Sequence, residues 1–589
     1  MKDIIELRRV WPYIKKYKGQ FFIGIIMILV VVVTAGLEPF ILGLAITEIG
    51  ENVIDLAQGV PGASMNYSYI LQIMIIYGLR GALNMIGRYF STFFISGVVQ
   101  KSMFDLRNDI SNKMNRLPVS YFDDHKLGDI LSRVTSDVES VSNFLTQTFS
   151  PTIMGILQII FSIVMIIAIR PQVLITIFIM MFLALVLSRL LVQWGQPIWK
   201  EQTKALGSLF ALTQEHLSGF TEMKVYNQEE ESLNQFKDMN ARLARAGATA
   251  SFRSGLVTPV TRFTADMAYV VVALTSGSQV IKGTVTLGNL QALVQYVSQI
   301  NQAINQMTEM SGAMQNAGAA SARVFELLDQ EEEDFSNETQ QLPEKVKGEV
   351  VFDHVQFGYS SDNILMNDIN FTVKPGDTVA IVGPTGAGKT TLINLILRFY
   401  EILGGAIYID NVDISEVSRQ NLRDHIGLVL QDAWLFEDTI AENIRFGDKN
   451  ATEEEIIKSA NIANVNHFIR TLPDGYDEVI DPDGDGISQG QKQLITIARA
   501  IISDPDILIL DEATSSVDTR LEQLIQSAMD KVMEGRTSFV IAHRLSTIRN
   551  ADLILVMDQG TIIETGNHDE LIEQNGFYAD LYQSQFAEE

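Results

Sequence analysis

The chain has 589 residues with 71 Asp or Glu and 44 Lys or Arg, which gives a formal net charge of −27 at pH 7. We do not expect nucleic acid as a partner, because binding to a phosphate backbone needs basic patches. The sequence has no cysteine, which excludes disulfides, thiolate metal sites and a cysteine nucleophile. A chain of this length is expected to form several structural units.

Long apolar segments fill the first half of the chain. A membrane-spanning helix needs roughly 20 mainly apolar residues, because lipid cannot satisfy exposed backbone groups. The candidate spans are Phe21–Ile46, Tyr69–Val98, Ser150–Ile169, Val173–Val192, Ser254–Ile281 and Gly283–Thr308. The first segment exceeds the apolar core of a secretory signal and no small-residue cleavage site follows it, so we expect a retained helix. The sequence therefore predicts a polytopic helical membrane domain with six transmembrane helices.

The charge of the connecting segments predicts the orientation. Thr47–Ser68 contains three acidic residues and no Lys or Arg, whereas residues 100–149 and 193–253 contain six and seven Lys or Arg. Because Lys and Arg accumulate in cytoplasmic loops, the N-terminus, both long segments and the C-terminal half are expected in the cytoplasm. Apolar residues at helical spacing in the two long segments favour membrane helices that continue as cytoplasmic stalks, with soluble hairpins as the alternative.

The last apolar segment carries glutamines on one helical face. Amides are costly against lipid, so this face should meet a partner helix or a water-filled cavity, and both interpretations stay open. Arg262 and Asp266 are spaced for an ion pair, whereas no partner is evident for Glu38, Arg80 and Arg88. The residues that we predict as candidates for a substrate cavity are Gln291, Gln295, Gln299, Gln302, Arg88 and Asp266.

A phosphate-binding pattern opens the second half. The apolar run Asp377–Gly383 is followed by the sequence GPTGAGKT, which ends at Thr390, and then by a helical pattern. In a strand–GxxxxGK[ST]–helix arrangement, glycines let backbone N–H groups converge on phosphate oxygens at a helix N-terminus. Lys389 is expected to reach the β- and γ-phosphates and Thr390 to ligate Mg²⁺. The pattern predicts ATP and Mg²⁺ as cofactors and an α/β P-loop ATPase domain.

An acidic pair follows a second apolar strand. Residues 507–510 precede Asp511 and Glu512, and an α/β sheet places its chemistry at the carboxyl ends of its strands. Asp511 is expected to hold Mg²⁺, and Glu512 to polarise the attacking water.

Together with further motifs, these residues occur in the order found in ABC exporters. Along essentially its whole length, the chain resembles a half-transporter of the multidrug type of this family. The further motifs are Tyr359 in FGYSS, Gln431 in LVLQDAWLF, the segment 487–491 (ISQGQ), the turn 515–518 and His543 in IAHRLST. The resemblance implies that Tyr359 stacks on adenine, that Gln431 ligates Mg²⁺, and that His543 contacts the γ-phosphate. Catalytic roles are thereby implied for Glu512, His543 and Gln431, and metal-binding roles for Thr390, Gln431 and Asp511. Nucleotide-binding roles are implied for Tyr359, Gly383, Thr385, Gly386, Ala387, Gly388, Lys389, Thr390, Thr391, Ser488, Gln489, Gly490, Gln491 and Asp518.

The resemblance also implies how the chain is divided. A transmembrane domain is expected over residues 1–325, a linker over 326–347 and a nucleotide-binding domain over 348–589. Short coupling helices are implied near Tyr121–His125 and Thr221–Tyr226. The expected location is the bacterial cytoplasmic membrane, with the N-terminus and the ATPase domain in the cytoplasm.

One motif departs from the family pattern, Leu-Ser-Gly-Gly-Gln, because this chain has Ile487 and Gln489 in the first and third positions. In the family this segment binds ATP held by a second subunit. An altered segment beside an intact Glu512 and His543 resembles the catalytically complete chain of heterodimeric exporters. A homodimer that tolerates Gln489 is the alternative.

The resemblance implies ATP-driven export of amphipathic small molecules (drugs) by alternating access. The apolar, Met- and amide-rich interior expected for the helix bundle suits amphipathic compounds, including cationic ones. A lipid flippase of the same family is the main alternative, and a nucleotide-gated channel is opposed by the complete Glu512 and His543 pair. The expected partners are a second half-transporter chain, membrane lipid and a small-molecule substrate.

Overall fold

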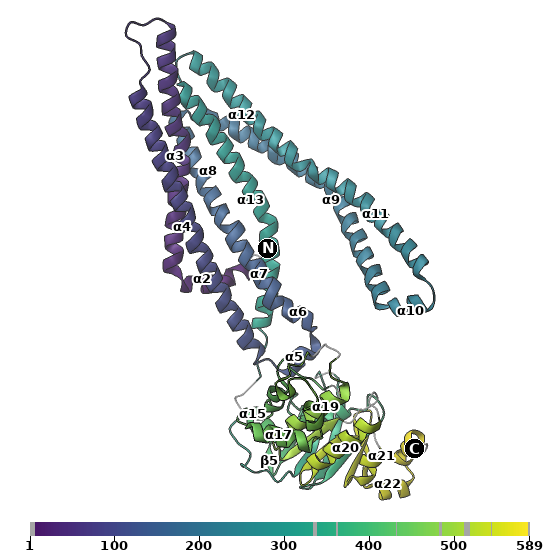
Figure 1. The fold of residues 1–589 in the computed structure, drawn as a ribbon. Helices are drawn as coiled ribbons and strands as arrows, with labels where there is room; N and C mark the ends of the chain where they lie inside the picture. The colour runs from purple at the N-terminus through teal and green to yellow at the C-terminus, as the bar shows by residue number, and fades with distance from the viewer. Residues whose placement is uncertain are drawn as a thin grey trace. The chain divides into compact units, whose positions relative to one another are not determined.

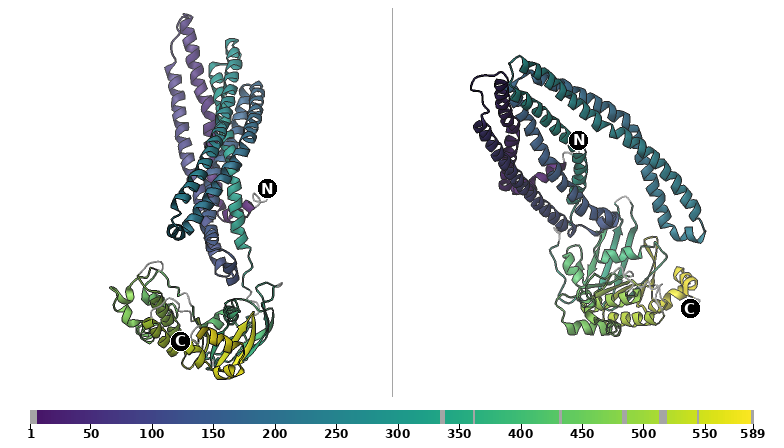
Figure 2. Two further views of the ribbon diagram at one scale, coloured as in Figure 1. Left: turned by 90° about the vertical axis from the view of Figure 1, so that its right-hand side faces the viewer. Right: turned by 45° about the horizontal axis from the view of Figure 1, so that its top comes forward.

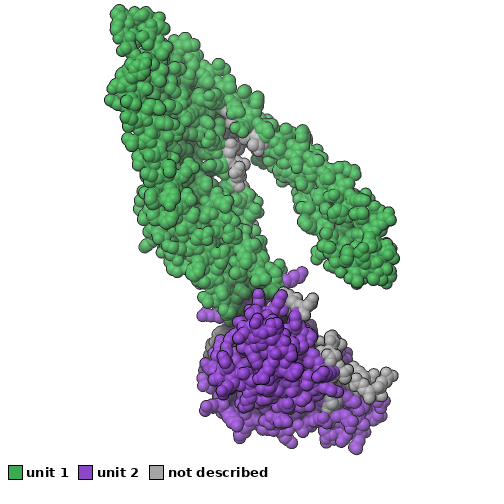
Figure 3. Space-filling view, viewed as in Figure 1, with its two compact units in different colours: residues 1–115, 127–330 green, residues 116–126, 331–589 purple. Residues whose placement is uncertain are grey.

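A computed structural model describes residues 6–333, 338–360, 363–430, 433–481, 486–511, 519–542 and 545–586. Gln431, Glu512, the turn 515–518 and His543 therefore lie outside the described residues. The chain forms two compact units, which Figure 3 distinguishes by colour. Unit 1 contains residues 1–115 and 127–330, and unit 2 contains residues 116–126 and 331–589.

Every regular element among the described residues of unit 1 is a helix (Figure 1). These helices are η1 (Arg8–Val10), α2 (Trp11–Lys16), α3 (Lys18–Ala57), α4 (Tyr67–Met114), α6 (Leu127–Ser132), η2 (Arg133–Asp137), α7 (Val138–Asn143), η3 (Phe144–Phe149), α8 (Ser150–Ile169), α9 (Gln172–Ser218), α10 (Phe220–Val225), α11 (Glu229–Gly255), α12 (Val257–Ile281) and α13 (Leu287–Leu328). Within the described residues, the helical stretches long and apolar enough to cross a membrane are Lys18–Ala57, Tyr67–Met114 and Leu127–Ile169.

Several helices are longer than a bilayer requires. Helix α4 has 48 residues and α9 has 47, so at a rise of about 1.5 Å per residue each is roughly 70 Å long, against a hydrocarbon core of about 30 Å. The predicted span Ser254–Ile281 crosses the junction of α11 and α12, and the last predicted span begins four residues before α13. Helix α9 runs beside α11 and α12, and α10 forms the turn at the end of the α9–α11 pair (Figures 1 and 2). The helix lengths agree with the predicted extensions beyond the bilayer.

The backbones of α3 and α13 approach closely where both carry glycine. A Cβ on Gly288 would lie 1.7 Å from the carbonyl oxygen of Gly43, so a side chain cannot fit there. The hydroxyl of Tyr296 donates to the carbonyl of Gly36 over 2.9 Å and fixes the same two helices further along. Small residues permit such close contact between membrane helices. The glutamine face of α13 is thereby held against α3.

Unit 2 is an α/β unit with two sheets. The four-stranded sheet has the order β2-β1-β4-β5, and the six-stranded sheet has the order β10-β9-β3-β8-β7-β6, in which β9, β3, β8, β7 and β6 are parallel. The strands are β1 (Val350–Phe357), β2 (Met366–Val373), β3 (Thr378–Val382), β4 (Gly404–Ile409), β5 (Val412–Asp413), β6 (Ile426–Val429), β7 (Ile507–Asp511), β8 (Thr537–Ile541), β9 (Leu553–Asp558) and β10 (Thr561–Gly566). The helices are α5 (Val119–Asp124), α14 (Lys389–Ile396), α15 (Arg419–Asp424), α16 (Ile440–Arg445), α17 (Glu453–Ile462), α18 (Asn466–Ile469), η4 (Gly475–Asp477), α19 (Gln489–Ile502), α20 (Thr519–Met533), α21 (Leu545–Asn550), α22 (His568–Gln574) and α23 (Phe577–Phe586). One hydrophobic core lies between the two sheets and includes residues of α14. In a second hydrophobic core, α16, α17, α19 and α20 pack against the central strands.

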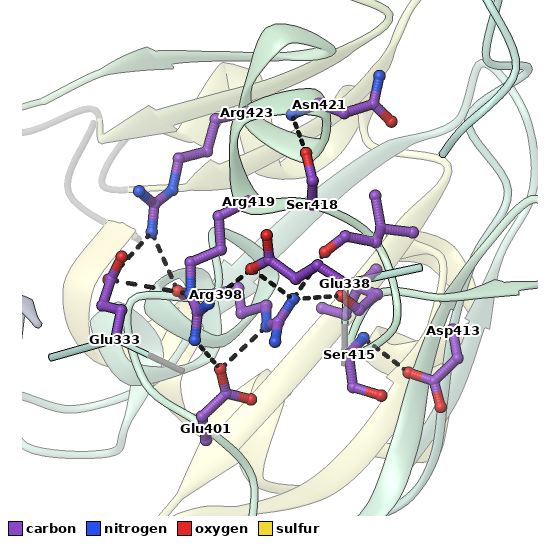
Figure 4. A network of polar contacts seen from close by, with 12 residues as sticks. Glu333, Glu338, Arg398, Glu401, Asp413, Ser415, Ser418, Arg419, Asn421 and Arg423 are labelled. Atoms are coloured by element: carbon purple, nitrogen blue, oxygen red, sulfur yellow. Dashed lines mark hydrogen bonds and ion pairs between the residues drawn. The ribbon is translucent and has the colours of Figure 1, made fainter. Parts of the chain in front are cut away.

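A buried ionic network attaches the segment after α13 to the α/β fold of unit 2 (Figure 4). Glu338 lies 2.6 Å from Arg419 and 3.6 Å from Arg398, and all three side chains are less than a tenth exposed. Glu401 bridges the same two arginines at 2.9 and 2.6 Å. Because buried charges are stable only when paired, Glu338 belongs to the structural core of unit 2.

Replacing Glu338 by Gln should destabilise unit 2, because an amide cannot neutralise the buried guanidinium groups of Arg398 and Arg419. Removing one partner of a buried ion pair costs about 3 kcal/mol, which for a unit of this size lowers the unfolding midpoint by roughly 6–10 °C. Thermal unfolding of the purified protein measures this shift. Glu344→Gln, at an exposed site in the same segment, is the matched control. Equal midpoints for the two variants would contradict a stabilising role for the network.

Candidate functional site

The loop between β3 and α14 has the shape that phosphate binding needs. Gly386 and Gly388 adopt φ values of +84° and +102°, which favour glycine. A Cβ on Gly383 would lie 2.2 Å from the carbonyl oxygen of Met557, so the loop also requires close backbone contact at this point. Lys389 begins α14, and its ammonium donates to the carbonyls of Gly383 and Pro384 at 2.8 and 3.0 Å. The lysine is therefore held over the loop in which a triphosphate would bind.

The parallel sheet brings an acidic residue to the same edge. Strands β3, β8 and β7 are neighbours and run parallel, so Asp511, at the carboxyl end of β7, lies on the side of the sheet where the phosphate loop follows β3. Burial lowers the pKa of Lys389, and the negative charge of Asp511 partly opposes this shift. The two groups thus interact electrostatically without a nucleotide. A triphosphate with Mg²⁺ would fit between an ammonium and a carboxylate.

The two threonines at the start of α14 have different surroundings. Thr390 is exposed, as a hydroxyl that ligates Mg²⁺ must be. Thr391 is buried, and its hydroxyl is 2.8 Å from the hydroxyl of Tyr359. The ring of Tyr359 is 59% exposed, which leaves it accessible to a stacking base.

The segment that resembles the family signature forms a helix start. Ser488 caps α19, its hydroxyl accepts from the backbone N–H of Gln491 over 3.4 Å, and the Gln491 side chain accepts from the backbone N–H of Ser488 over 2.9 Å. Gln489 is exposed and Gly490 is buried at the first turn. A helix N-terminus favours an anion through its free N–H groups and its dipole.

Four predicted residues are not placed by the described part of the chain. Gln431, Glu512 and His543 follow β6, β7 and β8 by two, one and two positions in the sequence, and Asp518 precedes α20. Their roles stay predictions.

Sequence reasoning missed a set of contacts that leads from α5 to the predicted adenine site. The hydroxyl of Tyr400 donates to Asp123 of α5. The Tyr400 ring meets the Tyr359 ring edge-on, with centroids 5.2 Å apart, and Tyr359 in turn contacts Thr391 of α14. Burial and the contact with Asp123 raise the pKa of Tyr400, so its hydroxyl stays protonated and donates at neutral pH. These contacts connect α5 with the start of the phosphate-loop helix.

Replacing Tyr400 by Phe removes the bond to Asp123 and keeps the ring against Tyr359. We expect the stimulation of ATP hydrolysis by a transported compound to fall by about tenfold, because a hydrogen bond to a charged group contributes roughly 1.5 kcal/mol. The measurement compares ATPase rates with and without the compound. Tyr408→Phe, on β4 in the same unit, is the matched control. Unchanged stimulation in Tyr400→Phe would contradict a role of the α5–Tyr400 contact in coupling transport to ATP hydrolysis.

Charged residues of the membrane unit pair differently from the sequence expectation. Arg80 of α4 lies 3.0 Å from Glu38 of α3, and the hydroxyl of Tyr77 donates to the same carboxylate over 3.0 Å. Arg262 and Asp266 are both described and exposed on α12, and the structure records no ion pair between them. The predicted Arg262–Asp266 pair is therefore wrong, and the pair that forms joins adjacent helices, which intrahelical spacing cannot reveal.

The glutamine face of α13 divides into two parts. Gln291 donates to Gln295 over 2.7 Å, and Gln299 accepts from Gln158 of α8 over 2.8 Å, so these amides bond within the protein. Gln302 lines a cavity of about 460 Å³ with Gln299 and Arg88. Asp266, Gln291 and Gln295 are not among the residues that line it. Both interpretations of the glutamine face thus apply: Gln291 and Gln295 bond to each other, Gln302 lines the cavity, and Gln299 does both.

A helical membrane unit joined to a phosphate-loop α/β unit defines a membrane-bound nucleotide-dependent ATPase. Residues 21–304 match the family described as the ABC transporter transmembrane region, and residues 366–515 match the family described as ABC transporter. The fatty acid ABC transporter ATP-binding/permease protein of Mycobacterium bovis is 44% identical over 536 residues, which cover 90% of this chain and 84% of the relative. This chain belongs to the ABC transporter family.

Further relatives agree with this assignment over almost the whole chain. A putative multidrug export ATP-binding/permease protein of Bacillus subtilis is 33% identical over 98% of both chains. An ATP-dependent lipid A-core flippase of Saccharophagus degradans is 34% identical over 99% of both. A solved structure of a bacterial Atm1-family ABC exporter with ATP bound has a TM-score of 0.74 and 26% identity, and covers 97% of this chain and 98% of that chain.

The chain is therefore an ABC exporter with a helical membrane domain fused to an ABC ATPase domain, as the sequence predicts. It binds nucleotide and couples ATP hydrolysis to transport across the bacterial cytoplasmic membrane, with the ATPase domain in the cytoplasm. ABC exporters act as dimers, so a second subunit is required.

Proposed function

We propose that this chain is the catalytically complete half of a heterodimeric exporter of amphipathic small molecules. The observation that carries the proposal is the phosphate loop under Lys389 with Asp511 on the same edge of the sheet. In this proposal Thr390, Gln431 and Asp511 hold Mg²⁺, Glu512 and His543 position the attacking water, and Tyr359 stacks on adenine. The transmembrane domain, linker and nucleotide-binding domain occupy residues 1–325, 326–347 and 348–589.

Binding of ATP between two chains would drive the conformational cycle. ATP acts as a ligand that favours the closed dimer, and hydrolysis removes that preference. The N-terminus of α19, with Ser488, Gln489, Gly490 and Gln491, would contact ATP held by the second chain. Gln489 in place of glycine adds a side chain at this contact, which favours unequal composite sites and hence a heterodimer.

The short helix α10 supports the need for a second chain. Phe220, Val225 and Tyr226 are 50%, 69% and 72% exposed, and no residue of α10 is buried. Exposed apolar and aromatic side chains at a turn outside the bilayer favour an interaction surface. We propose that the ATPase domain of the second chain covers them.

Purification of the chain alone and together with the half-transporter encoded beside it tests the heterodimer. We expect the co-purified pair to hydrolyse ATP at least about tenfold faster than the chain alone, because a composite site needs both chains. The rate of phosphate release at saturating ATP measures this difference. Full activity of the chain alone would contradict the heterodimer and favour the homodimeric alternative.

Lipid transport is the second candidate function. The relatives named as a fatty acid transporter and a lipid A-core flippase support it, as does a cavity whose lining includes an arginine. ATP-dependent movement of a fluorescent phospholipid across proteoliposomes, measured beside efflux of a fluorescent drug, distinguishes the two candidates.

A further inference from the structure

A polar cavity of about 460 Å³ lies within the membrane unit between α3, α4, α8 and α13. Its walls combine hydroxyls and amides with apolar side chains, and its volume is within the roughly 300–1,000 Å³ typical of small-molecule sites. Gln299 is fixed by bonds to Gln158 and to the carbonyl of Ala35. Gln302 and Gln306 also line the cavity, and both are exposed.

Arg88 is the only charged residue among the described residues that line this cavity. Arg80, eight positions earlier on α4, is neutralised by Glu38 at 3.0 Å. Within the described residues, by contrast, Arg88 forms no ion pair and its guanidinium donates no hydrogen bond. Its side chain is exposed, and it lines both this cavity and a shallower hollow beside Tyr89. An unpaired cation inside a membrane segment is costly and marks a binding or transport path. The charge that this cavity would accept is therefore negative.

A second, largely apolar cavity of about 540 Å³ adjoins the first. Its lining includes Trp11, Phe149, Met310 and Met314, and one charged residue, Arg8, at the N-terminal end of the chain. Ile95 of α4 lines both cavities. Arg88 and Val99, which lines the apolar cavity, are 11 positions apart on α4, which corresponds to roughly 16 Å along the helix. An apolar space thus begins within the length of an acyl chain from the unpaired guanidinium.

We propose that the two cavities together bind a long-chain amphiphile with an anionic head group, whose head contacts Arg88 and whose acyl chain occupies the apolar cavity. This proposal rests on the proposed export function and names the substrate class. A guanidinium forms two parallel hydrogen bonds with a carboxylate or a phosphate. Gln302 and Gln306 can donate further hydrogen bonds to the head group, and Met310 and Met314 adapt to a flexible chain. The proposal therefore narrows the substrate class from amphipathic compounds in general to long-chain amphiphiles with an anionic head group, and it disfavours cationic compounds.

Equilibrium binding to the full-length chain with its partner chain, in phosphatidylcholine nanodiscs without nucleotide, tests the proposal. The probes are palmitate, hexadecyl phosphate, methyl palmitate and hexadecyltrimethylammonium, which share one chain length and differ in head-group charge. We expect the two anions to bind at least about tenfold more tightly than the ester and the cation, since hydrogen bonds between charged groups are worth roughly tenfold or more. A preference between palmitate and hexadecyl phosphate identifies the head group as carboxylate or phosphate.

Variants assign the preference to Arg88. Arg88→Gln should reduce the anion preference to within about twofold, and Arg88→Lys should retain most of it, because the positive charge remains. Arg189→Gln, at an exposed arginine of α9 that lines neither cavity, is the matched control and should keep the preference. In the unaltered protein, octanoate should bind at least tenfold more weakly than palmitate, because burial of each methylene contributes about 0.8 kcal/mol.

The proposal is overturned if the protein binds the anions no more tightly than the ester and the cation, or if Arg88→Gln leaves this difference intact. It is also overturned if Arg88→Gln weakens binding of the ester and of the anions equally, because that result would indicate a structural ion pair between Arg88 and the partner chain. Equal binding of octanoate and palmitate would also overturn the placement of the acyl chain. Because no nucleotide is present, these results are independent of ATP turnover. A failure of the export function would appear in the ATPase and efflux measurements, not in these binding ratios.

Discussion

Replacing Glu512 by Gln is expected to abolish most ATP turnover and to leave ATP binding intact. The amide has nearly the same shape as the carboxylate but cannot polarise the attacking water, and general-base catalysis contributes roughly 10²- to 10⁴-fold. The rate of phosphate release from the purified pair should therefore fall by at least about 100-fold. The affinity for MgATP should stay within about threefold, because the carboxylate acts on water rather than on the phosphates.

Glu534→Gln is the matched control, since Glu534 is an exposed acid of the same unit beyond α20. It should preserve both turnover and binding. If Glu512→Gln hydrolysed ATP at the unaltered rate, Glu512 would be rejected as the group that activates water, and the assignment of this chain as the catalytically complete half would be lost with it.

Replacing Lys389 by Ala should weaken ATP binding itself. The ammonium is already held over the phosphate loop by the carbonyls of Gly383 and Pro384, and these bonds would be exchanged for phosphate oxygens. Hydrogen bonds to charged groups contribute about 1.5–3 kcal/mol, so the dissociation constant for MgATP should rise roughly 10- to 100-fold. Titration with a fluorescent ATP analogue measures this change.

Lys458→Ala, at an exposed lysine on α17, removes the same charge from the same unit and should leave the affinity unchanged. Loss of affinity in both variants to the same extent would show that net charge, rather than the position of Lys389, controls binding. Glu512→Gln and Lys389→Ala therefore separate hydrolysis of the nucleotide from its binding.

The phosphate loop and the position of Asp511 were predictable because each rests on a local sequence pattern. The phosphate loop, its lysine and the following helix are contiguous, and Asp511 ends an apolar strand, so a strand–loop–helix pattern and the rules of parallel sheets are sufficient to predict their arrangement. The position of Tyr359 against Thr391 followed from neither rule. Its contact joins two segments 32 residues apart, and only the family resemblance connected Tyr359 with the nucleotide.

Polar contacts between membrane helices were not predictable in the same way. Glu38 and Arg80 lie on separate helices, and their pairing depends on how α3 and α4 are rotated against each other. The periodicity of the glutamines established that they share a face, but not that Gln299 bonds to α8 while Gln302 lines a cavity. The same limit applies in unit 2, where the contact between Tyr400 and Asp123 joins positions 277 residues apart. Such pairs follow from tertiary packing, which a single sequence does not encode in a readable pattern.

The most direct test of the account is a structure of the Glu512→Gln protein with its partner chain and MgATP. We expect the triphosphate to contact the ammonium of Lys389, Asp511 to lie at the metal, and the α19 N-terminus of the opposite chain to close over the same nucleotide. A triphosphate distant from Lys389, or a nucleotide enclosed by one chain alone, would contradict the proposed coupling of ATP to transport.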